Sequence, residues 1–230
     1  MAKTSARRSS ATKQAKRAVP SDDTLSGWQQ RALDRSLVEA KRRALSKSNG
    51  FVGAAGELLT ATGGLNFTVQ DVVDRSKLSL RSFYQTFASK DDLLLALFEE
   101  CVSTAAEWQR GRMLKHDDPI EQIREFLTSL WIGQLSPDVV RALSLYTLTL
   151  SATRPSDLAH ALEPQLNVLH EAVERGITTG QLRDDIDASR LSEILLHTAN
   201  AAVHTTILQT GNESPDDVWA FCFGGIRGQA

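Results

Sequence analysis

The chain has 230 residues, a formal net charge of -2 and two cysteines, Cys101 and Cys222, that lie far apart in the sequence. Isolated cysteines without an early secretory apolar run favour a reducing, cytoplasmic compartment and argue against a disulfide framework or a Cys-based zinc site. No apolar run approaches the roughly 20 residues of a membrane span, so we expect no membrane partner.

The charge is divided unevenly along the chain. Residues 1–90 hold 16 Lys and Arg against 7 Asp and Glu, a net of +9. Residues 91–230 hold 10 against 21, a net of -11. This asymmetry indicates that only the front of the chain meets a polyanion.

Residues 1–27 are basic and contain almost no bulky apolar side chain. Such a segment cannot bury enough surface to offset its ordering entropy, so we expect it to be disordered in the free protein. Three interpretations stay open. It is a solvated tail, an arm that contacts DNA phosphates or the minor groove, or a transit peptide, although it lacks the apolar helical face of the last.

Residues 28–63 follow a helical pattern in two parts. Leu33, Leu37 and Ala44 mark the first part, Phe51, Val52 and Leu58 mark the second, and Gly63-Gly64 ends it. Asn49-Gly50 is a candidate break or kink between them, so the pattern allows one helix or two.

Residues 67–92 predict two short helices and the start of a third. Thr68 followed by Asp71 has the pattern of a capping box, and Ser79 and Ser89 are expected to cap the next two helices. Residues 75–78 form the turn, and Phe83 and Phe87 face the core because they are four residues apart. This arrangement is a helix-turn-helix.

At these residues the sequence resembles the TetR (tetracycline-repressor) family of bacterial transcription regulators. The resemblance spans about residues 51–95 and is carried by Thr68, Val72-Val73, Leu78-Ser79, Phe83-Tyr84, Phe87 and Ser89-Lys90-Asp91. Lys77, Leu80 and Arg81 depart from the family pattern, which puts the base preference in doubt. The resemblance implies an all-α homodimer, with a three-helix DNA-binding domain at residues 28–92 and a larger effector-binding and dimerisation domain at residues 93–230.

In a helix-turn-helix, the second helix enters the major groove of double-stranded DNA. Its Arg81 can bond guanine, Gln85 can pair with adenine, and Leu80 can contact a thymine methyl. The residues expected to reach bases or phosphates are Thr68, Lys77, Ser79, Leu80, Arg81, Ser82, Tyr84, Gln85 and Lys90. The alternative is a solvated helix face.

The acidic part, residues 93–230, predicts helices only. Pro119, Pro137, Pro155 and Pro215 mark helix starts, Pro164 is expected to kink one helix, and Gly176 and Gly180 are expected to bracket a turn. The last two helices, 188–208 and 218–226, look suited to helix pairing, and the family resemblance implies that they build the dimer interface. An effector pocket is predicted at Phe98, Cys101, Trp108, Phe126, Leu130, Trp131, Tyr146, Leu150, Leu166 and His170. For each of these residues, ordinary core packing is the alternative.

The sequence predicts neither catalysis nor a cofactor. His197, Asn200 and His204 share one helix face, but a metal site there lacks a further ligand, so these residues are expected to line a pocket, pack at an interface or bond within the core. We therefore expect a ligand-responsive regulator, a repressor that binds a palindromic operator as a dimer and is released by a small, largely apolar effector. Two alternatives are an architectural DNA-binding protein without an effector, and an enzyme with a vestigial DNA-binding head.

Overall fold

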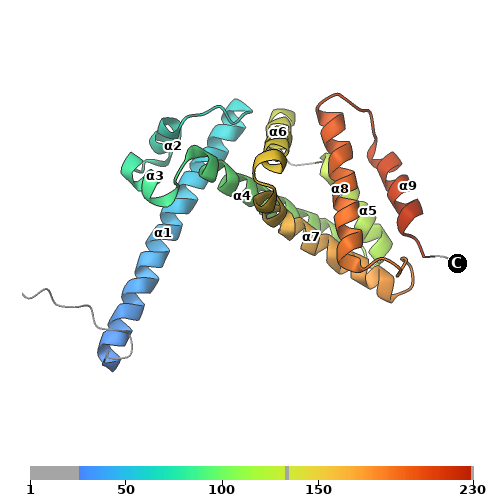
Figure 1. Cartoon of the computed structure of the whole chain (residues 1–230), viewed down its shortest axis with the longest axis horizontal. Helices are drawn as coiled ribbons and strands as arrows, with labels where there is room; N and C mark the ends of the chain where they lie inside the picture. Colours follow the sequence, from blue (N-terminus) through green and yellow to red (C-terminus); the bar gives the residue numbers. More distant parts are fainter. Residues whose placement is uncertain (1–25, 133–134, 229–230) are drawn as a thin grey trace, which may run out of the picture. The chain divides into compact units, whose positions relative to one another are not determined.

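A computed structural model describes residues 26–132 and 135–228. Within them the chain is helical and has no strand, only an isolated bridge between Leu182 and Arg227. The helices are α1 (Gly27–Thr62), α2 (Val69–Ser76), α3 (Leu80–Thr86), α4 (Lys90–Met113), α5 (Pro119–Ile132), α6 (Pro137–Thr153), α7 (Pro155–Thr178), α8 (Ala188–Ile207) and α9 (Pro215–Ile226) (Figure 1). The predicted all-α class is confirmed. The basic arm predicted over residues 1–27 lies outside the described residues except for Ser26 and Gly27.

The chain divides into two compact units, one ending at Ala44 and the other beginning at Leu45. The described part of the first unit is the N-terminal half of α1, and none of its described residues is buried. Trp28, Leu37 and Val38 are 65%, 58% and 68% exposed. This half of α1 therefore has no hydrophobic core of its own among the described residues.

The candidate break at Asn49-Gly50 does not occur. Helix α1 continues through these residues, from Gly27 to Thr62. A Cβ atom on Gly50 would lie 3.3 Å from Cδ1 of Leu78, in the turn between α2 and α3. The glycine at this position therefore allows the turn to pack closely on α1 and does not end the helix.

Side-chain caps begin α2, α3 and α4 as predicted. Thr68 forms a complete capping box with Asp71, while Ser79 and Ser89 accept hydrogen bonds from the backbone N–H groups of Ser82 and Asp92. Each such cap stabilises a helix start by about 0.5–2 kcal/mol. Further caps are Ser136, Asp187 and Ser214.

The first core of this unit joins the C-terminal half of α1 to α2, α3 and the beginning of α4. Phe51, Phe83 and Leu93 are completely buried in it. Val139, near the start of α6, is 2% exposed and belongs to the same cluster. The helix-turn-helix therefore shares its core with helices from beyond residue 92.

The remaining helices pack around α7. It contacts α4, α5, α6 and α8, and α9 packs on α5 and α8 (Figure 1). Gly176 was expected in a turn but lies inside α7, where an added Cβ atom would be 2.6 Å from Cδ1 of Leu182. Because the chain folds back over this point, the glycine provides room for Leu182, and only Gly180 (φ +74°) lies in the turn.

Candidate nucleic-acid interface and ligand cavity

The turn between α2 and α3 depends on Lys77. Its φ of 58° and ψ of 20° put it in the left-handed region at the C-terminus of α2. Glycine is the usual residue there, because a side chain costs about 1 kcal/mol in that conformation. Lys77 therefore keeps the turn geometry at some cost and adds an exposed positive charge beside α3.

Aromatic packing fixes the orientation of α3. Phe83 meets Phe51 edge to face, with 5.4 Å between ring centroids, and its ring also lies 5.8 Å from that of Phe87. Since Phe83 is completely buried, the opposite side of the short helix faces outward.

The outward side of α3 carries Leu80, Arg81, Tyr84 and Gln85, all exposed. Their positions at i, i+1, i+4 and i+5 put them on one helical face. Arg81 and Gln85 offer the donors and acceptors that read base edges, and Leu80, 44% exposed, offers an apolar contact. The structure therefore brings four of the predicted DNA-contacting residues together.

Ser82 lies on the other side of α3 from this face. It is 7% exposed, and its hydroxyl has no hydrogen-bond partner among the described residues. The sequence expectation overlooked that Ser82 and Phe83 turn inward together. The predicted contact between Ser82 and DNA would therefore require this side chain to turn outward.

The predicted phosphate-contacting residues also have structural roles. The hydroxyls of Thr68 and Ser79 are engaged in helix caps. The Lys90 ammonium donates to the carbonyl oxygen of Leu65 at 2.8 Å and lies 5.1 Å from the centroid of the Phe67 ring. Lys90 therefore ties the start of α4 to the loop before α2, with two ammonium hydrogens left for other acceptors.

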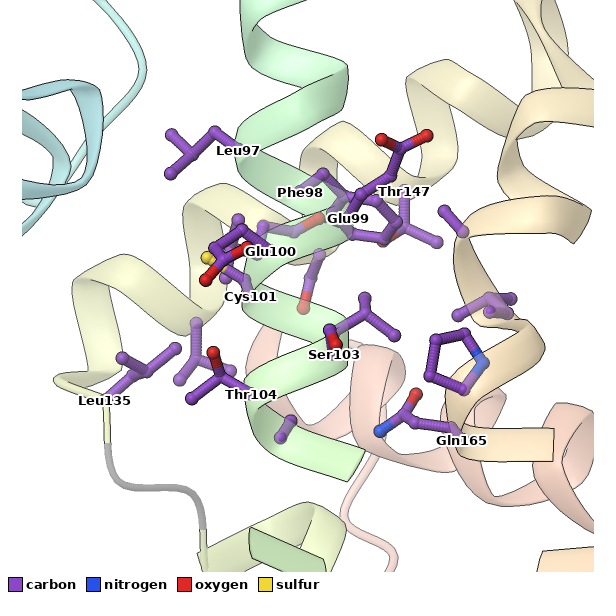
Figure 2. Close-up of a pocket in the computed structure, with 18 of the residues that line it drawn as sticks. Leu97, Phe98, Glu99, Glu100, Cys101, Ser103, Thr104, Leu135, Thr147 and Gln165 are labelled. Atoms are coloured by element: carbon purple, nitrogen blue, oxygen red, sulfur yellow. Dashed lines mark hydrogen bonds between the residues drawn. The ribbon is translucent and has the colours of Figure 1, made fainter. Parts of the chain in front are cut away.

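A cavity of about 1300 Å³ lies among α4, α5, α6, α7 and α8 and extends to the C-terminal half of α1 (Figure 2). Of the ten residues predicted for a pocket, five line it: Phe98, Cys101, Trp108, Leu130 and Trp131. The cavity is large enough for a drug-sized molecule.

The other five predicted pocket residues are not on the cavity wall. Phe126 and Leu150 are 0% and 1% exposed and fill separate cores, and Tyr146 packs on Phe98 and hydrogen-bonds the Asp91 carbonyl oxygen at 3.4 Å. Leu166 packs against the body core, and His170 is half-buried away from the lining. Apolar periodicity alone does not distinguish a cavity wall from a filled core.

Three buried polar residues of the lining were missing from the sequence prediction. Gln109, Ser129 and Gln165 are 2%, 1% and 7% exposed and line the cavity. The sequence contains a signal for the two glutamines, because each interrupts an apolar helical stripe. Gln109 falls between Ala106 and Met113, and Gln165 falls between Leu162 and Leu169.

Burial keeps the titratable groups of the inner wall uncharged. Desolvation lowers the pKa of His204, so its imidazole is neutral at pH 7. Burial, and then the charge of Glu100, raises the pKa of the Cys101 thiol. Asn200 lines the cavity with His204, whereas His197 is exposed, and no cluster of metal-binding side chains occurs in the described residues.

Comparison with protein families gives a match over residues 52–97, to the family described as bacterial regulatory proteins, tetR family. The match covers the C-terminal part of α1, all of α2 and α3, and α4 as far as Leu97. The three-helix head of this chain is therefore a DNA-binding domain of the TetR family of bacterial regulatory proteins.

Solved structures share the TetR fold over most of the chain. RolR in complex with resorcinol has a TM-score of 0.64 at 16% identity, with 83% of this chain and 92% of that chain covered. FadR of Thermus thermophilus, a repressor in complex with lauroyl-CoA, gives 0.61 at 17%, covering 77% and 91%. Reduced NemR of E. coli gives 0.60 at 16%, covering 80% and 99%.

No curated protein matches this sequence. Among the helices that the structure describes, none is long and apolar enough to cross a membrane.

Proposed function

We propose that this TetR-family regulator is a repressor that binds a palindromic operator as a homodimer and releases it when a small molecule enters the cavity. The observation that carries the proposal is the sharing of residues between head and cavity. Leu97 is 3% exposed in the core of the DNA-binding head and also lines the cavity. A ligand that moves α4 there moves a residue of the head's core.

The second helix of the cavity wall, α6, supports the same coupling. Leu143 of α6 lines the cavity and packs against the head core. Val139, one turn earlier, is buried in that core. An effector shifts the population of DNA-binding conformers only if it binds one conformer more tightly, and a wall shared with the head provides such a difference.

The reading surface is the exposed face of α3. Leu80, Arg81, Tyr84 and Gln85 enter the major groove, with Arg81 on a guanine and Gln85 on an adenine. Lys77 and Lys90 are placed to contact phosphates, which adds affinity without base specificity.

The dimer forms through α8 and α9. Phe221 is 75% exposed and Ile194 is 42% exposed on these helices. Gly224 and Gly225 are exposed within α9, and an added Cβ on either would meet nothing within 4 Å in this chain. A glycine inside a helix costs about 1 kcal/mol relative to alanine. The two glycines offset this cost if a partner helix packs closely against them, because they have no Cβ atom to keep it away.

Resorcinol in RolR and lauroyl-CoA in Thermus thermophilus FadR support a small-molecule effector here. The two ligands differ widely in size and charge, so the relatives do not define the chemical class.

The proposal is tested by selecting operator DNA from a random pool and measuring affinity for two variants. Arg81→Ala is expected to weaken binding by about 1–3 kcal/mol and to relax one base position. Lys115→Ala, which removes an exposed basic side chain that follows α4, is the matched control and is expected to bind like the parent protein. If Arg81→Ala binds the selected DNA like the control, α3 is not the reader.

A further inference from the structure

The buried wall of the cavity contains no charged side chain. Its buried members are Leu97, Phe98, Val102, Gln109, Ser129, Ser144, Ala161, Leu162, Gln165 and Val203. The charged lining residues Glu100, Asp138, Arg141, His160 and Glu163 are exposed, and Glu99 is half-buried. A charged ligand group at the buried wall would lose its hydration and find no counterion there, which costs several kcal/mol.

A hydrogen-bonded chain crosses this wall from α7 to α5. Nε2 of Gln165 donates to Oε1 of Gln109 at 3.0 Å, Nε2 of Gln109 donates to the Ser129 hydroxyl at 3.3 Å, and that hydroxyl donates to the Phe126 carbonyl at 2.6 Å. Figure 2 shows Gln165 extending from α7 toward α4.

The direction of this chain follows from its fixed end. The Phe126 carbonyl can only accept, so Ser129 must donate to it and accept from the amide nitrogen of Gln109. Oε1 of Gln109 then accepts from Gln165, which leaves Oε1 of Gln165 as the open end. Among the described residues, no group donates to that oxygen. The open end is an acceptor.

A second polar group on the lining lacks a partner and has the opposite character. The indole Nε1 of Trp131 is buried and has no hydrogen-bond partner among the described residues. This nitrogen has almost no accessible surface, so a bound molecule would reach it only if the indole moved. The wall therefore offers an open acceptor, Oε1 of Gln165.

We infer that the effector is a neutral molecule with an apolar body and a hydroxyl- or amide-like group, whose hydrogen is donated to Oε1 of Gln165. The inference rests on the proposed effector function of this cavity. A carboxylate offers no donor to Gln165, and both a carboxylate and an ammonium would bring an unpaired charge to the buried wall.

Calorimetry on the full chain near neutral pH tests this with three probes of one shape: para-butylbenzamide, para-butylbenzoate and para-butylbenzylammonium. The amide is expected to bind at least about tenfold more tightly than either ion. Equal or tighter binding of the carboxylate or the ammonium overturns the inference, and so does the absence of amide binding at millimolar concentration.

A fourth probe tests the role of Gln165. The N,N-dimethyl form of the amide keeps the acceptor oxygen and lacks the N–H donor, so it is expected to bind about tenfold more weakly than the parent amide. In Gln165→Leu this preference should vanish, whereas Leu130→Met, which changes an apolar part of the lining, should retain it. A preference that persists in Gln165→Leu overturns the assignment.

Two measurements keep the outcomes separable. The probe comparison on the unaltered chain does not depend on any variant folding, and helical circular dichroism checks the two variants. Affinity for selected operator DNA is measured without probes. If DNA binding holds while the amide preference fails, only the ligand class is overturned.

Discussion

Gly63, at the C-terminus of α1, and Asp138, near the N-terminus of α6, approach so closely that a Cβ atom on the glycine would lie 2.8 Å from Cβ of the aspartate. Gly63 also has a φ of +65°, in the left-handed region that ends many helices. Both features require glycine, and the contact joins the DNA-binding head to a helix of the cavity wall.

Gly63→Ala should therefore lower the free energy of unfolding by about 1–3 kcal/mol, from backbone strain and from displacement of Asp138. Gly64→Ala is the matched control, because its added Cβ would meet nothing within 4 Å. Chemical denaturation compares the two. Equal midpoints would show that the Gly63–Asp138 contact is dispensable.

Replacement of Lys77 separates strain from charge. Lys77→Gly and Lys77→Ala both remove one positive charge from each protomer, and both should make the salt dependence of operator binding shallower by about one unit of slope per protomer. Only the glycine relieves the left-handed conformation (φ 58°), so Lys77→Gly should be about 1 kcal/mol more stable than Lys77→Ala. Thermal unfolding and DNA titrations at several salt concentrations measure both effects. Identical stabilities would argue against strain at the turn.

The exposed ring of Phe221 provides a test of the α8–α9 interface. Phe221→Arg should yield monomers in sedimentation experiments and weaken operator binding at least about tenfold, since an unpaired charge is costly in an apolar interface. Leu114→Arg is the control, because Leu114 is equally exposed (73% against 75%) but follows α4. A dimer that survives Phe221→Arg places the interface elsewhere.

His204 should make stability depend on pH in a defined direction. Burial lowers its folded-state pKa below the ordinary value of 6.5, so the unfolded chain binds the proton more readily. Above about pH 6.5 the His204 imidazole is neutral in both the folded and the unfolded state, so it does not reduce stability there. As the pH drops from about 6.5 toward the lowered folded-state pKa, the unfolded state takes up the proton first and the free energy of unfolding falls. His204→Gln should flatten this acid-side loss in denaturation experiments between pH 8 and 5.

His160 provides a control of opposite sign. Its hydrogen bond to Glu163 raises its pKa, so its contribution is present below 6.5 and is lost as pH rises through the raised folded-state value. Because His160 is exposed, His160→Gln should change the profile only slightly, and toward less stability at low pH. If both variants behave alike, burial of His204 is not the cause of the acid-side loss.

The sequence by itself determined the local structure of the head. Thr68 with Asp71, Ser79 and Ser89 begin their helices as predicted, because a cap is a contact between residues two or three positions apart. Prolines in the first turn marked the starts of α5, α6, α7 and α9 in the same way. Neighbours in the sequence are neighbours in space here, so the pattern was sufficient.

Only the tertiary structure decided which residues of the body meet. Phe98 and Phe126 have similar patterns in the sequence, yet Phe98 lines the cavity and Phe126 fills a core. Gln109, Ser129 and Gln165 come from three helices, and the bonds that join them are set by helix packing. By contrast, the helix-turn-helix pattern of residues 67–92 is local, so it predicts the helix caps and the outward side of α3 from the sequence. The physical reason for the division is range: caps and turns are closed within a few residues, whereas a cavity depends on how distant helices fill the space between them.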